Sequence, residues 1–534
     1  MINMDLDRYK IAIIINVTDE ASYKLTIKSL TKLIVPAKYK VEIITTQKEI
    51  NIATAYNRVM KSSSAKYKIY LRAGIEIINK NFFGDIINIF KTNWNIGIIG
   101  MSGVKIIPTD ANIFVSSTRI GKIRSINNKN IVFSDCNDSY EFAAAIDDYL
   151  MVTQYDINWR NDLFSSEGLY NIAQCIEFKR NYYSTAVAGQ KEPWILYREK
   201  NIIMTQDERE RFFDEYSRDI YPLVSILIPT YNRSEYFEIA LKSALMQTYR
   251  NIEIIVGDDS TDDRTEKIVR RYQSEYKNIV YIKNTDVYSN AAERAYANYR
   301  GILHKCHGKY VNYLNDDDVF APKKIEKMMN YYLQYPNISL VTSYRRLIDE
   351  LGNEVNAEGY PRWIVEKDCL VKAEKAVKSL IMNFNFIGEP TTALIKRCDI
   401  EENLGMFAGK SFNCINDMPQ WIASLQKGDL IYIKEPLSSM RIHSKQRSKD
   451  LFTQVVFKVE LMHMYLLTYQ KKIINRNDLV NLLLEWLQQL GKNIRIFKLL
   501  KQQKKMFFYD EDIIEEFIFL KKQAEKIVNN NEES

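Results

Sequence analysis

Three consecutive carboxylates, Asp316–Asp318, follow directly on a short apolar stretch of the chain. Carboxylate oxygens are hard ligands, and they suit divalent cations such as Mg²⁺ and Mn²⁺. A helix cap would explain a single Asp at this point, but a cap seldom needs three carboxylates after an apolar strand. We therefore expect Asp316–Asp318 to belong to a metal site.

Two further polar clusters follow apolar stretches in the same part of the chain. Asp258 and Asp259 come after residues 252–256, and the segment 229–233 comes after residues 224–228. A simple Asx turn would explain Asp258, and it explains Asp259 less well. Ligands of open α/β sheets bind beyond the carboxyl ends of the strands. We therefore expect all three polar clusters to face one crevice.

The elements that must position these residues alternate between short strands and helices, which is typical of a parallel α/β sheet. The expected strands are 224–228, 252–256, 279–283 and 310–314, and the expected helices are 234–247 (capped by Ser234), 263–276 and 291–305. This α/β domain is expected to span residues 222–450.

The first 200 residues repeat this order in weaker form. The matching pairs are 13–16 with 226–229, 27–30 with 241–244, 41–44 with 252–255, and 67–71 with 310–314. Gln47 and Lys48 stand where the second copy has Asp258 and Asp259, and the segment Ala73-Gly74-Ile75 stands where it has three carboxylates. A site without carboxylates cannot hold a hard cation in the same way. We expect residues 1–200 to be a degenerate, non-catalytic copy, with chance similarity of two α/β domains as the alternative.

The remaining segments show helical patterns only. Residues 201–221 are rich in charge at helical spacing, which indicates a linker helix between the copies. Apolar faces recur within 479–490 and 513–527. We expect residues 451–534 to form a packed helical region, and membrane-surface or partner-docking helices are the alternative.

The composition of the 534 residues excludes several classes of protein. The net charge of +7 is a mild, dispersed excess, so nucleic acid is not an expected partner. The six cysteines lack metal-binding or disulfide spacing, which favours the cytoplasm. No run of about 18 apolar residues occurs, so we expect any membrane contact to be peripheral, at the inner face of the membrane. A homo-oligomer is compatible with the additional domains.

The motifs within residues 222–448 resemble those of family 2 glycosyltransferases of the GT-A fold. The matching segments are IPTYNR at 228–233, IIVGDDS at 254–260 and GKYVNYLNDDD at 308–318, in the order of the family. The first copy resembles a degenerate glycosyltransferase-like domain. The resemblance implies an inverting enzyme that uses Mn²⁺ or Mg²⁺ and moves a sugar from a nucleotide sugar, here a UDP-sugar.

The resemblance also implies roles within the triplet. Asp317 would bind the metal, Asp316 would lie toward the ribose, and Asp318 would lie toward the donor sugar. The sequence departs from the strict family motif at Asn315, where that motif has Asp. The assignment within the triplet therefore stays open, and the role of the triplet as a whole does not depend on it.

Further donor contacts are implied by the same resemblance. Asp259 would accept a hydrogen bond from the imide N–H of the base, Tyr231 would flank the base, and Arg294 would lie near the base and phosphates. A solvated helix arginine is the alternative for Arg294. The other donor-binding residues that we expect are Pro229, Thr230 and Arg233.

The acceptor side depends on three later residues. Asn416-Asp417 resembles the Glu-Asp motif of the family, which implies that Asp417 is the general base for the acceptor hydroxyl. A helix N-cap is the local alternative. His443 would complete the metal or diphosphate site, or it is an ordinary histidine. Glu389 would touch acceptor hydroxyls, or it shapes a Gly-Glu-Pro turn.

The expected acceptor is a glycan or a lipid-linked glycan, and a Ser or Thr of a surface protein such as flagellin is the second possibility. Two other classes compete for the whole domain. A nucleotidyltransferase usually opens with a Gly-rich phosphate loop, and none follows Ile228. A non-catalytic nucleotide-sugar-binding module would not need the full set of carboxylates.

Overall fold

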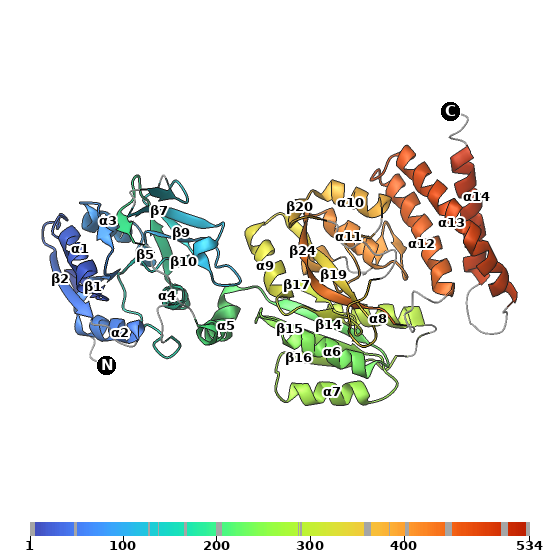
Figure 1. Cartoon of the computed structure of the whole chain (residues 1–534), viewed down its shortest axis with the longest axis horizontal. Coiled ribbons are helices and arrows are strands. Elements are labelled where there is room, and N and C mark those ends of the chain that lie inside the picture. The colour runs from blue at the N-terminus through green and yellow to red at the C-terminus, as the bar shows by residue number, and fades with distance from the viewer. Residues whose placement is uncertain are drawn as a thin grey trace. The chain divides into compact units, whose positions relative to one another are not determined.

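The computed structural model describes residues 6–46, 51–126, 129–136, 138–164, 168–198, 205–286, 288, 291–356, 365–383, 385–400, 405–443, 451–502 and 511–529. The protein divides into two compact units, Met1–Tyr221 and Pro222–Ser534 (Figure 1). Gln47 and Lys48, which served to compare the two copies, lie outside the described residues.

The first unit contains a seven-stranded sheet and a smaller sheet. The large sheet has the order β2-β1-β3-β11-β5-β12-β9, and the smaller one contains β10-β6-β7-β13-β4 with β8 on β7. The strands are β1 (Asp7–Asn16), β2 (Lys40–Thr46), β3 (Ala65–Arg72), β4 (Glu76–Ile77), β5 (Ile96–Gly100), β6 (Ser102–Val104), β7 (Arg119–Ser125), β8 (Asn130–Val132), β9 (Tyr140–Ala143), β10 (Ala145–Ile146), β11 (Leu150–Thr153), β12 (Ser184–Ala188) and β13 (Ile195–Tyr197). The helices are α1 (Glu20–Leu30), α2 (Ile52–Ser62), α3 (Phe82–Thr92), η1 (Ile113–Val115), α4 (Tyr170–Arg180) and α5 (Gln206–Ile220).

The second unit is built on a nine-stranded sheet of order β16-β15-β14-β17-β21-β19-β24-β18, with β20 on β24. The strands are β14 (Val224–Thr230), β15 (Ile252–Asp258), β16 (Ile279–Lys283), β17 (Tyr310–Tyr313), β18 (Val319–Phe320), β19 (Ile338–Ile348), β20 (Cys369–Val371), β21 (Leu394–Lys396), β22 (Met406–Phe407), β23 (Lys410–Ser411) and β24 (Asp429–Arg441). The helices are α6 (Ser234–Leu245), α7 (Arg264–Gln273), α8 (Ala291–His304), α9 (Lys324–Gln334), α10 (Ala373–Met382), η2 (Arg397–Asp399), α11 (Asp417–Leu425), α12 (Leu451–Gln470), α13 (Arg476–Gln502) and α14 (Glu511–Asn529).

The two large sheets share their strand order and their register. In each sheet an antiparallel strand, β11 or β21, separates parallel strands. Ile11 of β1 pairs with Val41 and Tyr67, and Val224 of β14 pairs with Ile252 and Tyr310. These are the pairings that the matched sequence segments require. The repeat in the sequence is therefore a repeat of the sheet, and not a chance likeness.

Helix α5, which lies where the sequence predicts a linker helix, packs as part of the first unit. Its apolar side chains Phe212 and Tyr216 are buried. Glu215 of α5 lies 2.9 Å from Arg160 and 2.7 Å from Arg180 of α4. Apolar burial and ion pairs together bind α5 to α4, while residues 201–204 lie outside the described residues.

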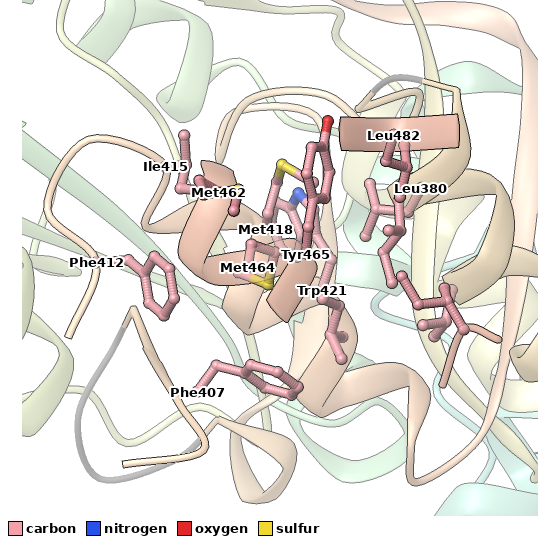
Figure 2. Close-up of a cluster of buried hydrophobic side chains, with 14 of the residues drawn as sticks. Leu380, Phe407, Phe412, Ile415, Met418, Trp421, Met462, Met464, Tyr465 and Leu482 are labelled. Atoms are coloured by element: carbon pink, nitrogen blue, oxygen red, sulfur yellow. The ribbon is translucent and has the colours of Figure 1, made fainter. Parts of the chain in front are cut away.

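The C-terminal helices share one hydrophobic core with the sheet of the second unit. Figure 2 shows Leu380 of α10, Trp421 of α11, Tyr465 of α12 and Leu482 of α13 in one cluster of buried side chains. Phe517 and Leu520 of α14 belong to the same cluster. The described C-terminal helices thus pack as part of this unit. No helix among the described residues is long and apolar enough to cross a membrane.

Candidate active site

A pocket of about 460 Å³ lies at the carboxyl ends of β14, β15 and β17, next to α8. We call it the donor pocket. It brings together Pro229, Thr230, Tyr231, Arg233, Asp259, Arg294, Asp316, Asp317 and Asp318. The strand ends of the sheet thus converge, as the order of motifs predicts, because β15, β14 and β17 are neighbours and run parallel.

Asp316 accepts several hydrogen bonds from residues that line the donor pocket. Its carboxylate accepts a hydrogen bond from the Thr230 hydroxyl at 2.9 Å and from the Tyr231 backbone N–H at 3.3 Å. Arg233 donates to it at 3.2 Å. Burial, with the charge of Asp317 next to it, raises the pKa of Asp316 to about 6. The end of β14 is therefore tied to the end of β17 through this carboxylate.

Arg233 also explains a local departure from the sequence prediction. It occupies the N-cap position of α6, so Ser234 is the first helical residue and not the cap. The Arg233 side chain is directed to Asp316 and Asp317. The side chain of Arg233 thus neutralises two carboxylates and does not cap the helix.

Asp317 and His443 come together although 126 residues separate them in the chain. His443 Nε2 lies 3.0 Å from Asp317 Oδ2, and Arg233 donates to the same oxygen at 2.8 Å. The Arg441 side chain donates from Nε to the Asp317 carbonyl at 2.9 Å, which fixes the end of β24 against the triplet. His443 is buried, so it is no ordinary surface histidine.

Asp318 is buried in the pocket wall. The Thr391 hydroxyl and the Asn315 amide donate to its Oδ2 at 2.5 Å and 3.2 Å, and the Arg441 backbone N–H donates to Oδ1 at 3.1 Å. Burial raises the pKa of Asp318 well above its ordinary value. These contacts tie Asp318 to the residues before β21 and to the end of β24. Its expected contact with the donor sugar stays a prediction.

Asp258 and Asp259 have separate surroundings. Asp258 is buried and accepts from Ser260 N–H at 2.8 Å and from the Tyr281 hydroxyl at 2.7 Å, so it makes the Asx turn that was the simpler explanation. Asp259 lines the donor pocket and accepts from the Asn284 amide at 2.7 Å. Burial raises the pKa of Asp259.

The side chains of Tyr231 and Arg294 contact each other in the wall of the pocket. The guanidinium carbon of Arg294 lies 3.4 Å from the centre of the Tyr231 ring, which is cation–π geometry. The Arg294 Nε is buried and has no hydrogen-bond partner among the described residues. A solvated arginine on an outer helix face does not fit these contacts.

A close approach of α8 to β15 brings Arg294 to this place. The Asn298 amide of α8 donates to the Gly257 carbonyl at 2.8 Å. A Cβ on Gly257 would lie 2.0 Å from Asn298 Oδ1, so any larger residue at 257 would push α8 away.

Asp417 does not line the donor pocket. It is the first residue of α11, and it lines a second cavity between α11 and the C-terminal helices. The Asn385 amide donates to it at 2.6 Å, and the Met418 N–H donates at 2.8 Å. Burial raises the pKa of Asp417 to about 6. Such a carboxyl is suited to take up a proton near neutral pH.

Glu389 is the acidic residue of the acceptor-side loop that does face the donor pocket. Its Oε2 lies 2.7 Å from Nε of Arg345, and its buried Oε1 has no hydrogen-bond partner among the described residues. Gly388 precedes it with a φ of 99°, a backbone conformation that glycine adopts without strain. The turn and the charged side chain are thus both present.

Sequence reasoning missed the residues that hold the site together. They are Asn284, Asn298, Arg345, Thr391 and Arg441, and each bonds or pairs with a group that lines the pocket or with the strand beneath it. Arg441 stands in the motif of His443, and this proximity was the one available signal. The amides and Thr391 lie on elements that look ordinary in the sequence.

Few side chains are placed to act as ligands of a metal ion. In the part of the chain that the structure describes, no three His, Cys, Asp or Glu side chains form a complete metal site. Asp317 and His443 offer one carboxylate and one imidazole 3.0 Å apart. Two such ligands fit a cation that takes its other ligands from phosphate oxygens and water, as Mg²⁺ usually does.

Comparison with known proteins gives the class of this chain. Residues 12–216 match the family described as "Glycosyltransferase like family", and residues 225–387 match "Glycosyl transferase family 2". An uncharacterized glycosyltransferase of Rickettsia prowazekii is 31% identical over 242 residues, which cover 45% of this chain and 70% of that protein. The chain therefore belongs to the family 2 glycosyltransferases and is an enzyme of that class.

Two further proteins are similar to this chain. A Bacillus subtilis protein named for teichuronic acid biosynthesis, TuaG, is 25% identical over 43% of this chain and 82% of its own. Residues 1–349 of Staphylococcus aureus TarS, solved with UDP, align with a TM-score of 0.40 and 15% identity over 57% of this chain and 83% of that one. Against a longer TarS chain the alignment covers 43% of TarS. Membership sets aside the nucleotidyltransferase and the purely binding module for the chain as a whole.

Proposed function

We propose that the second unit transfers a sugar from a UDP-sugar to a hydroxyl of a glycan or lipid-linked glycan, with inversion at the anomeric carbon. The observation that carries the proposal is the meeting of Asp259, Asp316 and Asp317 in one pocket with Tyr231 and Arg294. This is a set of groups for a base, a ribose and a diphosphate.

The residues around Tyr231 support a uracil subsite. Uracil presents an imide N–H, and Asp259 supplies an acceptor oxygen in a half-buried position. The Tyr231 ring, with Arg294 against one face, supplies an aromatic surface. Arg294 Nε, which lacks a protein partner among the described residues, is available to a phosphate or base oxygen.

The residues around Asp317 support diphosphate departure. Asp317 and His443 would hold the divalent cation, which when bound neutralises charge on the leaving diphosphate. Asp316 keeps the loop after β14 in place through Thr230. Arg233 holds two of the three aspartates and adds a positive charge beside the position of the phosphates.

Asp417 would take the proton of the acceptor hydroxyl as that hydroxyl attacks the anomeric carbon. Its pKa near 6 suits this role, and its charge is near enough to Glu389 for the two carboxylates to interact. The name of TuaG, which refers to teichuronic acid biosynthesis, supports a glycan as the acceptor class.

The test is UDP release from a panel of UDP-sugars with Mn²⁺, repeated after chelation and with Asp317→Ala. We expect release that depends on the metal and is lost in the variant. The configuration of the product linkage, read by NMR, tests inversion. Metal-independent release that survives Asp317→Ala would contradict the proposal.

A further inference from the structure

A second cavity of about 680 Å³ lies where α10 and α11 meet α12 and α13. We call it the helix cavity. Its inner wall is apolar and buried, with Leu380, Ile415, Met418 and Trp486. Figure 2 shows three of these elements converging at Leu380, Met418 and Tyr465. A cavity of this size is in the range that binds small ligands.

The outer rim of the helix cavity is exposed and more polar than its inner wall. Gln454 and Phe457 of α12 and Glu485 and Gln489 of α13 are exposed and line it. The cavity thus opens to solvent between two helices that lie beyond the residues matched by either family. A ligand can enter from this rim and reach the buried end.

The buried end carries the proposed general base. Asp417 and Asn385 both line the helix cavity, and their side chains are hydrogen bonded to each other. The segment from Asn385 to Glu389 borders both cavities, because Glu389 lines the donor pocket. Trp421 holds this segment by donating from Nε1 to the Gly388 carbonyl at 3.0 Å. One short segment therefore borders both cavities, and Asp417 of the helix cavity interacts electrostatically with Glu389 of the donor pocket.

Among the described residues, Lys458 of the helix cavity has no charged partner. Lys458 lines the cavity and donates to Gln489, and within the described part of the chain it forms no ion pair. Burial lowers the pKa of Lys458. Glu485 lies at the exposed rim, where water screens its charge. An anionic group of a ligand would supply what Lys458 lacks.

We propose that the helix cavity is the acceptor site, and that it takes a saccharide acceptor with an apolar aglycone and an anionic group that pairs with Lys458. This inference rests on the proposed function and adds the chemical class of the acceptor. The hydroxyl of the acceptor lies at Asp417, the apolar part lies along Phe457, Leu461 and Trp486, and the anion lies at Lys458. The C-terminal helices then determine which acceptor is used.

Three probes separate the parts of this proposal in calorimetric titrations of the full chain. Octyl β-D-glucuronide carries both the apolar chain and the carboxylate, octyl β-D-glucoside lacks the charge, and glucuronate lacks the chain. We expect octyl glucuronide to bind most tightly, by about tenfold over the glucoside, because a charge-assisted hydrogen bond to Lys458 is added. No saturable binding of octyl glucuronide, or equal binding of the two octyl glycosides, overturns the proposal.

Variants locate the binding. Lys458→Gln should weaken octyl glucuronide about tenfold and leave octyl glucoside unchanged. The exposed Lys471, at the end of α12, gives a matched control in Lys471→Gln, which should change neither. Leu461→Trp, which fills the cavity, and Phe457→Ala, which removes rim surface, should weaken both octyl glycosides. The proposed site is wrong if Lys458→Gln and Lys471→Gln have the same affinity for octyl glucuronide. It is also wrong if Leu461→Trp binds the octyl glycosides as tightly as the parent chain does.

Each variant is also titrated with UDP in the presence of Mn²⁺. We expect the affinity for UDP to be unchanged, because Phe457, Lys458 and Leu461 do not line the donor pocket. If UDP does not bind to the parent chain, the proposed function alone is refuted, since the octyl glycosides are titrated without a donor.

Discussion

At the end of β3, the first unit carries Arg72, whose guanidinium lies 3.3 Å from the buried Asp148. At the equivalent end of β17, the second unit carries Asn315 and then three aspartates. The sheets beneath these ends share strand order and register. The first unit neutralises its buried acid with a cation of its own chain. The second concentrates more carboxylates than Arg233 can neutralise, and the proposed divalent cation would balance this excess negative charge.

The largest effect is expected when the second unit loses Asp317, an acid that the first unit lacks at the equivalent position. Asp317→Ala should lower sugar transfer by about 10³-fold, because the charge of the leaving group loses its counter-ion. The measurement is UDP release with Mn²⁺. Asp262→Ala is the matched control, since Asp262 is an exposed acid that pairs with Arg264, and it should retain activity. Full activity of Asp317→Ala would remove the distinction between the units.

The next largest effect concerns Asp417, which lies on α11 after the shared strands. Asp417→Asn should lower kcat by about 10²-fold, because proton removal is lost, and should leave UDP binding intact. In the parent enzyme kcat/KM should fall as the pH drops below about 6, since the carboxyl with its pKa of about 6 then becomes protonated and cannot accept a proton. A profile of kcat/KM that stays flat between about pH 5 and about pH 8 would argue against Asp417 as the base.

A third change tests the internal cation of the first unit. Arg72→Ala should destabilise this unit by about 3 kcal/mol, because the buried Asp148 loses its cationic partner. Urea unfolding followed by tryptophan fluorescence measures the change, and Arg72→Lys should restore part of the stability. Titration of UDP with Mn²⁺ should be unaffected. A drop in UDP affinity would show that the first unit contributes to donor binding.

The smallest effect is expected from an attempt to rebuild the missing acid. Gly74 stands where the second unit has Asp317, but its φ is 93°, so an aspartate there is strained. Gly74→Asp should therefore bind no additional UDP, and the calorimetric stoichiometry should stay at one. A stoichiometry of two would mean that this single substitution gives the first unit a donor site.

The sequence predicted four strands of the second sheet and nine of the residues that line the donor pocket, because the apolar runs and the polar residues at their ends are local features. β16 has the predicted bounds, and β15 continues two residues past the predicted end. It did not predict that Asp417 would line a different cavity from Asp317, because that depends on how α11 packs against α12 and α13. Nor did it predict Thr391 or Asn284, whose roles arise only from strand pairing and loop closure.

The shared core of α10 to α14 sets a limit on how the chain can be dissected. A fragment that stops at residue 450 would strip Tyr465, Leu483 and Trp486 from the faces of Trp421 and Leu380, and would leave a large apolar surface in water. Such a fragment should be prone to aggregation even though every donor-pocket residue remains in it. Truncation studies of this enzyme are therefore better begun from the amino-terminal side, at the junction after Tyr221.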